Sequence, residues 1–184
     1  MPSNTLLLED GSMLLLEDGS GPSCPEPVPT SQDTDSPAKI IRKLIVDLGL
    51  ATMPTQTPDA DLWPAYYGKE PPKPDNCITV RTTDGGDYAR VMVDGQILGP
   101  FGFQVRIRAK DEQTGWKKAN DIQKGFAFNV LRRTVYIGPT DNRRVYLIHA
   151  VSKIGDVLPI GADTPTSQRF IHTLNAVVNI RQLS

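Results

Sequence analysis

The sequence predicts an α+β fold, in which a mixed or antiparallel sheet carries helices packed on one face. Three features support this prediction: a proline-capped helical segment after residue 36, a long amphipathic segment over 111–133, and several segments of alternating apolar and polar residues. Strands with a long helix between them are typical of layered α+β folds. About 147 residues, from 38 to 184, are enough to bury an adequate core.

Charge divides the chain into two parts. Residues 1–37 hold seven acidic residues and no Lys or Arg, whereas residues 38–184 hold 14 acidic and 20 basic residues. We therefore expect an acidic N-terminal arm over 1–37, rich in Pro and Gly, and a folded domain over 38–184. The net charge of −1 argues against a protein that binds polyanions by bulk attraction.

The arm contains an eight-residue repeat, in which TLLLEDGS over 5–12 is followed at once by MLLLEDGS over 13–20. Two copies are too few for a solenoid. Two interpretations remain open: a flexible tail, or a small hairpin or added strand that docks on a neighbouring subunit. In the second interpretation, the residues that contact the neighbour are Leu6, Leu7, Leu8, Leu14, Leu15 and Leu16.

A helix is predicted directly after the arm. Ser36 is a capping residue, Pro37 suits the first helical position, and Gly49 ends the pattern. The apolar residues between them recur at helical spacing: Ile40, Ile41, Leu44, Ile45 and Leu48.

A Pro-rich segment over 53–74 follows, and it contains Trp63, Tyr66 and Tyr67. We expect this segment to run extended over the domain with its rings held against the surface, in a structural role.

Several strands are predicted in the rest of the domain. Residues 77–83 alternate and end at a turn signal, and residues 88–93 suggest a second strand or an edge ribbon. The clearest alternation is over 103–109, where Phe103, Val105 and Ile107 should face inward while Gln104, Arg106 and Arg108 face outward. Further strand candidates are 134–137, 144–149 and 175–180.

The amphipathic segment over 111–133 is predicted to be a helix that packs on the sheet. Its apolar stripe comprises Trp116, Ala119, Ile122, Phe126 and Val130, and its opposite face carries Lys117, Lys118, Asp121 and Lys124.

The sequence offers few groups for chemistry, so we predict no catalytic, cofactor-binding or metal-binding residue and no cofactor. His149 and His172 have no Cys or carboxylate at ligand spacing beside them, and Cys77 lies in a strand pattern typical of a buried, unreactive thiol. The glycines over 95–102 lack the Lys and Ser/Thr of a phosphate loop. No apolar run approaches the length of a membrane span.

A small nucleic-acid-binding module is an alternative, because basic residues recur along the domain. They are Arg106, Arg108, Lys110, Lys117, Lys118, Lys124, Arg132, Arg133, Arg143 and Arg144. Aromatic residues do not interleave with them as base stacking would require, and solvated faces or ion pairs between subunits explain them as well.

The order of four segments resembles bacteriophage tail-terminator and minor capsid proteins of long-tailed phages. The segments are LWPAYYGKEPPKPDNCITV over 62–80, FQVRIR over 103–108, KANDI over 118–122 and NAVVNIR over 175–181. The resemblance spans roughly residues 38–184, and neither the leucine arm nor the insertion that begins at Gly85 and Gly86 belongs to the family pattern.

The resemblance implies a non-enzymatic α+β subunit of a ring, usually of six copies, in the tail or neck of a virion assembled in the bacterial cytoplasm. Such a ring caps the head-proximal end of the tail tube, stops its growth and joins the tail to the head connector. Its partners would be further copies, tail-tube protein and a head-completion or connector protein, with DNA passing through the lumen without sequence recognition. A head-completion role, or another neck or tail role, is the alternative.

The expected subunit contacts combine the outward arginines, the aromatic cluster and the arm. Besides the six leucines, these residues are Arg106, Arg108, Trp63, Tyr66 and Tyr67.

Overall fold

Two units, Met1–Thr34 and Asp35–Ser184, make up the chain in the computed structural model. The structure describes residues 5–7, 13–15, 35–55, 61–84, 89–90, 97–162 and 169–183. In the first unit, β1 (Thr5–Leu7) pairs antiparallel with β2 (Met13–Leu15), with Leu6 opposite Leu14. The two leucine runs therefore pair with each other, while Leu8 and Leu16 lie outside the described residues.

A mixed sheet forms the framework of the second unit. Its strands are β3 (Ala65–Tyr67), β4 (Cys77–Thr83), β5 (Ala89–Arg90), β6 (Ile97–Ala109), β7 (Leu131–Ile137), β8 (Arg144–Ser152), β9 (Leu158–Ala162) and β10 (Phe170–Leu183). In the described part of the chain the main order is β3-β4-β6-β10-β8-β7, while β5 pairs with β6 and β9 with β10. Only the β3–β4 pair among these is parallel, so the predicted mixed sheet is confirmed.

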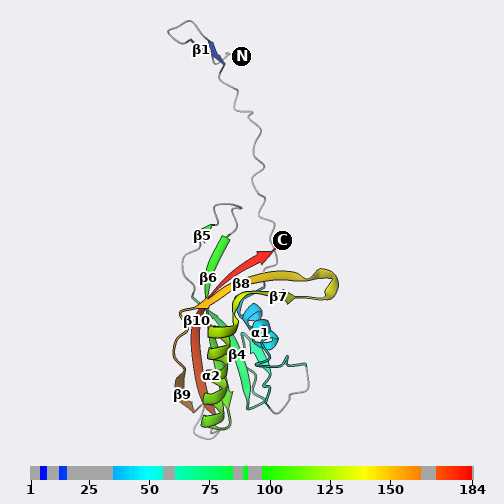
Figure 1. Cartoon of the computed structure of the whole chain (residues 1–184), viewed down its shortest axis with the longest axis vertical. Coiled ribbons are helices and arrows are strands. Elements are labelled where there is room, and N and C mark those ends of the chain that lie inside the picture. The colour runs from blue at the N-terminus through cyan, green and yellow to red at the C-terminus, as the bar shows by residue number, and fades with distance from the viewer. Residues whose placement is uncertain are drawn as a thin grey trace. The chain divides into compact units, whose positions relative to one another are not determined.

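Both helices cover the same face of the sheet (Figure 1). α1 (Pro37–Asp47) begins as predicted: Ser36 caps it by accepting a hydrogen bond from the Lys39 backbone amide, and Gly49 follows with a positive φ of 71°. α2 (Glu112–Asn129) is capped by Asp111, whose carboxylate accepts a hydrogen bond from the Thr114 amide. The predicted α+β class, with helices packed on one face, is therefore confirmed.

The core lies between this face and the helices. Phe103, Val105 and Ile107 of β6 are completely buried, as their alternation predicts, and the Phe103 ring meets Phe126 of α2 edge-on at 5.5 Å between centroids. Ile41 of α1 is also completely buried. These contacts fix α2 against the centre of the sheet.

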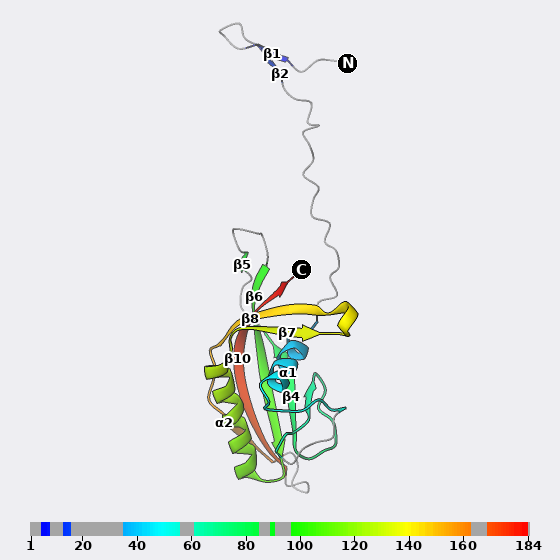
Figure 2. The ribbon, with the colours of Figure 1, turned by 45° about the vertical axis from the view of Figure 1, so that its right-hand side comes forward.

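The β7–β8 hairpin runs across the direction of β4, β6 and β10 (Figure 2). Its two strands are joined through the short helix η1 (Thr140–Asn142). β10 pairs with β8 along its C-terminal half, and the register shifts between Asn179 and Ile180. Such an irregularity is typical of a strand that bends sharply, and it accompanies the change of direction.

Several details differ from the sequence prediction. α2 ends at Asn129, and Leu131–Ile137 continue as β7, so the predicted helix is too long at its C-terminal end. Trp116, predicted on the apolar stripe, is 42% exposed, because Gly115 occupies the buried position beside the sheet. β9 was not predicted. Of the predicted 88–93 strand, only Ala89 and Arg90 lie among the described residues, in β5.

Substitution of Gly115 tests how closely α2 packs against the sheet. A Cβ at this position would lie 2.8 Å from Nδ1 of the buried His172 and 2.9 Å from the Ala109 Cβ. Gly115→Ala should therefore destabilise the domain by about 1–3 kcal/mol in urea unfolding, although Gly to Ala within a helix ordinarily stabilises.

Gly125→Ala is the matched control in the same helix. Its new Cβ would meet the end of the partly exposed Leu50 side chain, at 2.5 Å, and this side chain can rotate away. We expect unchanged or higher stability for this variant. Equal destabilisation of both variants would contradict the packing described for Gly115.

Candidate assembly surfaces

The candidate sites for chemistry are buried or isolated in the described structure. Cys77 is completely buried, and burial raises the pKa of its thiol to about 11, so the reactive thiolate is scarce at neutral pH. His172 is buried in β10 against Trp116. No group of three or more His, Cys, Asp or Glu residues among those described could hold a metal ion. Neither helix of the described chain has the length and apolar character needed to cross a membrane.

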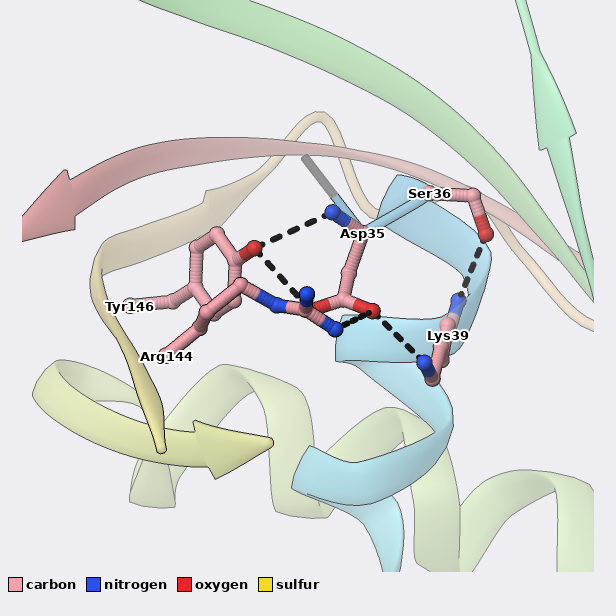
Figure 3. A network of polar contacts seen from close by, with 5 residues as sticks. All are labelled: Asp35, Ser36, Lys39, Arg144 and Tyr146. Atoms are coloured by element: carbon pink, nitrogen blue, oxygen red, sulfur yellow. Dashed lines mark hydrogen bonds and ion pairs between the residues drawn. The ribbon is translucent and has the colours of Figure 1, made fainter. Parts of the chain in front are cut away.

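Asp35 forms a polar network at the point where the first unit ends (Figure 3). Asp35 falls within the arm expected over 1–37, but its side chain is only 3% exposed and is held by the domain. Arg144 of β8 donates to both carboxylate oxygens, from Nε at 2.7 Å and from Nη2 at 2.9 Å. This two-point geometry fixes the carboxylate more firmly than a single contact would.

Two further side chains complete this network, which we call the Asp35 anchor. Lys39 Nζ lies 2.6 Å from Oδ1, and the Tyr146 hydroxyl donates to Oδ2 at 3.0 Å. Burial acts to raise the pKa of Asp35, but the hydrogen bonds from Lys39, Arg144 and Tyr146 outweigh it, so the pKa lies below its ordinary value. The anchor ties the start of α1 to β8.

A second charged cluster lies on the side of the sheet opposite the helices. The Glu70 carboxylate accepts a hydrogen bond from Arg108 Nη1 at 3.0 Å and forms an ion pair with Arg106, whose Nε lies 2.9 Å away. Arg81 Nη2 lies 3.7 Å from the same carboxylate. One carboxylate therefore faces three guanidinium groups from the neighbouring strands β4 and β6. The cluster joins the segment after β3 to the middle of the sheet.

Arg108, predicted to face outward from the sheet, is buried there by another segment of the same chain. It points away from the helices, as the alternation requires, but the segment over 70–75 covers it, and the residue is 3% exposed. Arg108 donates to the carbonyls of Pro71 and Pro74, both at 2.7 Å, and to that of Asp75 at 3.4 Å. A role within the subunit therefore accounts for Arg108, and its contact with a neighbour stays a prediction.

The aromatic residues predicted at subunit contacts, Trp63, Tyr66 and Tyr67, are buried to different degrees. Trp63 is 5% exposed and belongs to the core, with Lys118 Nζ 6.0 Å from its ring centroid. Tyr66 is half-buried. Tyr67 is 44% exposed, and the Arg42 guanidinium lies 4.7 Å from its ring centroid. The rings are held against the domain as predicted, and Tyr67 keeps the largest free surface for a partner.

Several large apolar side chains are exposed on other elements. Phe128 at the end of α2 and Leu131 at the start of β7 are 81% and 77% exposed, while Leu158 and Ile160 of β9 are 53% and 59% exposed. Exposed apolar groups that gather on a surface mark sites of protein association. None of these four residues was predicted from sequence to lie at an exposed surface, because their exposure depends on where α2 ends and on the unpredicted strand β9.

These surfaces are typical of a protein that works by association with other proteins. The family described as bacteriophage tail terminator protein matches residues 44–149. The chain belongs to this family, and it is a structural protein of a phage tail.

One solved structure, described as the virion of a native gene transfer agent particle, contains a similar chain. The two chains are 13% identical with a TM-score of 0.35, and the similarity covers 63% of this chain and 78% of that chain. No curated protein sequence matches the chain.

The Asp35 anchor makes a testable contribution to stability. Asp35→Asn would leave Lys39 and Arg144 facing a neutral amide, and we expect a loss of about 1–3 kcal/mol at pH 7. Because the folded-state pKa lies below 3.8, this contribution is present above pH 3.8 and is lost as the pH falls through the folded-state value. The difference between wild type and variant in urea unfolding should therefore shrink in acid.

Asp47→Asn provides the comparison. Asp47 forms an ion pair with Lys43 one helical turn away, but its side chain is 32% exposed. We expect a change below about 0.5 kcal/mol. If the two variants lose equal stability, the Asp35 anchor has no special role.

Proposed function

We propose that this protein forms a ring, expected to contain six copies, that caps the head-proximal end of the tail tube. The ring stops tube growth and offers a surface for the head-completion or connector protein, while DNA passes through its lumen without sequence recognition. The match to the tail-terminator family over residues 44–149 carries this proposal. No reaction is required of the subunit.

The distribution of exposed groups supports a ring. A closed ring of identical subunits uses two different, complementary surfaces on each copy. The four most exposed of the large apolar side chains described fall into two sets on separate elements, with Phe128 and Leu131 at the α2–β7 junction and Leu158 and Ile160 on β9. Each set is available for a different neighbour.

Charge supplies a second source of complementarity. With Asp35 assigned to the domain, residues 1–34 carry six acids and no base, and residues 35–184 carry 15 acids and 20 bases. The arm of one copy can therefore be attracted to the domain of the next. Attraction between exposed charges is screened by salt, which makes this contribution measurable.

Deletion of the gene tests directly whether this protein stops growth of the tail tube. Virions assembled without this protein should carry overlong or unjoined tails in electron micrographs, and expression of the wild-type protein in the host should restore normal particles. Tails of normal length that are joined to heads in the deletion strain would reject the proposal.

Deletion of residues 1–34 tests the contribution of the arm while leaving the Asp35 anchor in place. We expect the truncated protein to assemble more weakly than the full chain at low salt, measured by sedimentation velocity. The difference should narrow at high salt, because the opposite charges are then screened. A difference that does not depend on salt would argue against an electrostatic role for the arm.

A further inference from the structure

A groove runs along α2 on the surface of the domain. It has a volume of about 590 Å³ and lies between α2 and two segments of the chain, 49–50 and 61–63. The lining residues that matter below are Leu50, Lys117, Lys118, Asp121, Lys124 and Phe128. We call it the α2 groove.

The helical wall of this groove presents one face of α2 along most of its length. Thr114, Lys117, Asp121, Lys124 and Phe128 are spaced three or four residues apart, so they form a single stripe. Phe128 follows Thr114 by fourteen positions along the helix, which corresponds to about 21 Å. An extended segment of six residues spans about 20 Å and matches this length.

The wall is apolar at one end, and along the rest two exposed lysines, Lys117 and Lys124, flank the half-buried Asp121. Phe128 is 81% exposed, and Leu50 lies across the groove from the same part of α2. Lys117 and Lys124 are exposed and pair with no residue in the described part of the chain. The groove therefore suits an extended segment with apolar side chains followed by carboxylates.

Lys118 differs from these two lysines because the domain itself holds it. Its Nζ donates to the Asp61 carbonyl at 3.0 Å and lies near the Trp63 ring. Burial lowers the pKa of Lys118, which is consistent with a position in the floor of the groove. Lys117 and Lys124 are therefore the cations available to a ligand.

The chain itself contains a segment with this chemistry, in two copies. Each repeat in the arm has three leucines followed by Glu and Asp, at Glu9 and Asp10 in the first and at Glu17 and Asp18 in the second. With the glycine that follows, each repeat supplies six residues, the length that the α2 groove accommodates.

We propose that the α2 groove of each copy receives one leucine-acid segment from the N-terminal arm of a second copy. The leucines cover Phe128 and Leu50, and the carboxylates pair with Lys117 and Lys124. The other leucine run stays paired with the inserted one, as β1 pairs with β2. This inference rests on the proposed ring, in which each copy offers both an arm and a groove to different neighbours.

Carbodiimide cross-linking of the full-length protein tests the contact. A mixture of unlabelled and nitrogen-15-labelled protein is allowed to assemble, cross-linked and digested, and the linked peptides are identified by mass spectrometry. We expect links from Glu9 or Glu17 to Lys117 or Lys124, with half of them joining a labelled to an unlabelled peptide. Links that join only peptides of the same label would show that each arm binds its own domain, which overturns the proposal.

Charge reversal tests whether the cross-linked groups stabilise the assembly. Lys117→Glu combined with Lys124→Glu should weaken assembly about tenfold at low salt, as expected for loss of two exposed ion pairs. Adding Glu9→Lys and Glu17→Lys to this variant should restore most of the affinity. Lys69→Glu with Lys73→Glu is the matched control, since both lysines are exposed and lie outside the groove.

Failure of this inference is distinguishable from failure of the proposed function. If the groove variant assembles and terminates tails like the wild type and no arm-to-groove link forms, the groove assignment is wrong and termination stands. If the wild-type protein neither assembles nor affects tail length, the proposed function itself is wrong.

Discussion

The structure depends on a central strand, β6, that is covered on both of its faces. On the helix side, its apolar residues pack against Phe126 and the rest of the core. On the other side, Arg106 and Arg108 would be costly to bury without partners, and Glu70 with the carbonyls of the following Pro-rich segment supplies them. The helices and the extended segment are therefore both held by the same strand.

This arrangement separates the parts that build the domain from those available to other molecules. The charged groups near the middle of the sheet have partners within the subunit, and most of the large apolar residues lie in the core. The most exposed apolar residues lie at the end of α2, on β7 and on β9, and exposed lysines lie along α2. The Asp35 anchor ties the residue that follows the first unit to α1 and β8 through charge-assisted hydrogen bonds.

Local signals made the main elements predictable from sequence. Ser36, Pro37 and Gly49 determine the ends of α1 through capping, a fixed φ and a positive φ, and each acts within a few residues. The alternation of Phe103, Val105 and Ile107 gave the inward face of β6 because side chains alternate along a strand.

Contacts between distant parts of the chain were not predictable in this way. Arg108 is buried by residues more than thirty positions away, and Asp35 by β8, which lies more than one hundred positions away. Gly115 carries no apolar signal, yet it takes the buried position because His172 approaches α2 closely. β9 was not predictable because Pro159 and Gly161 weaken its strand pattern. Its extended conformation depends on pairing with β10.

A reconstruction of the neck of the intact virion by cryo-electron microscopy tests the central claim most directly. We expect density for the domain as a closed ring between the last layer of the tail tube and the head connector, with the exposed apolar residues at subunit contacts. Density for this protein along the shaft of the tube, or isolated single copies in the particle, would contradict it.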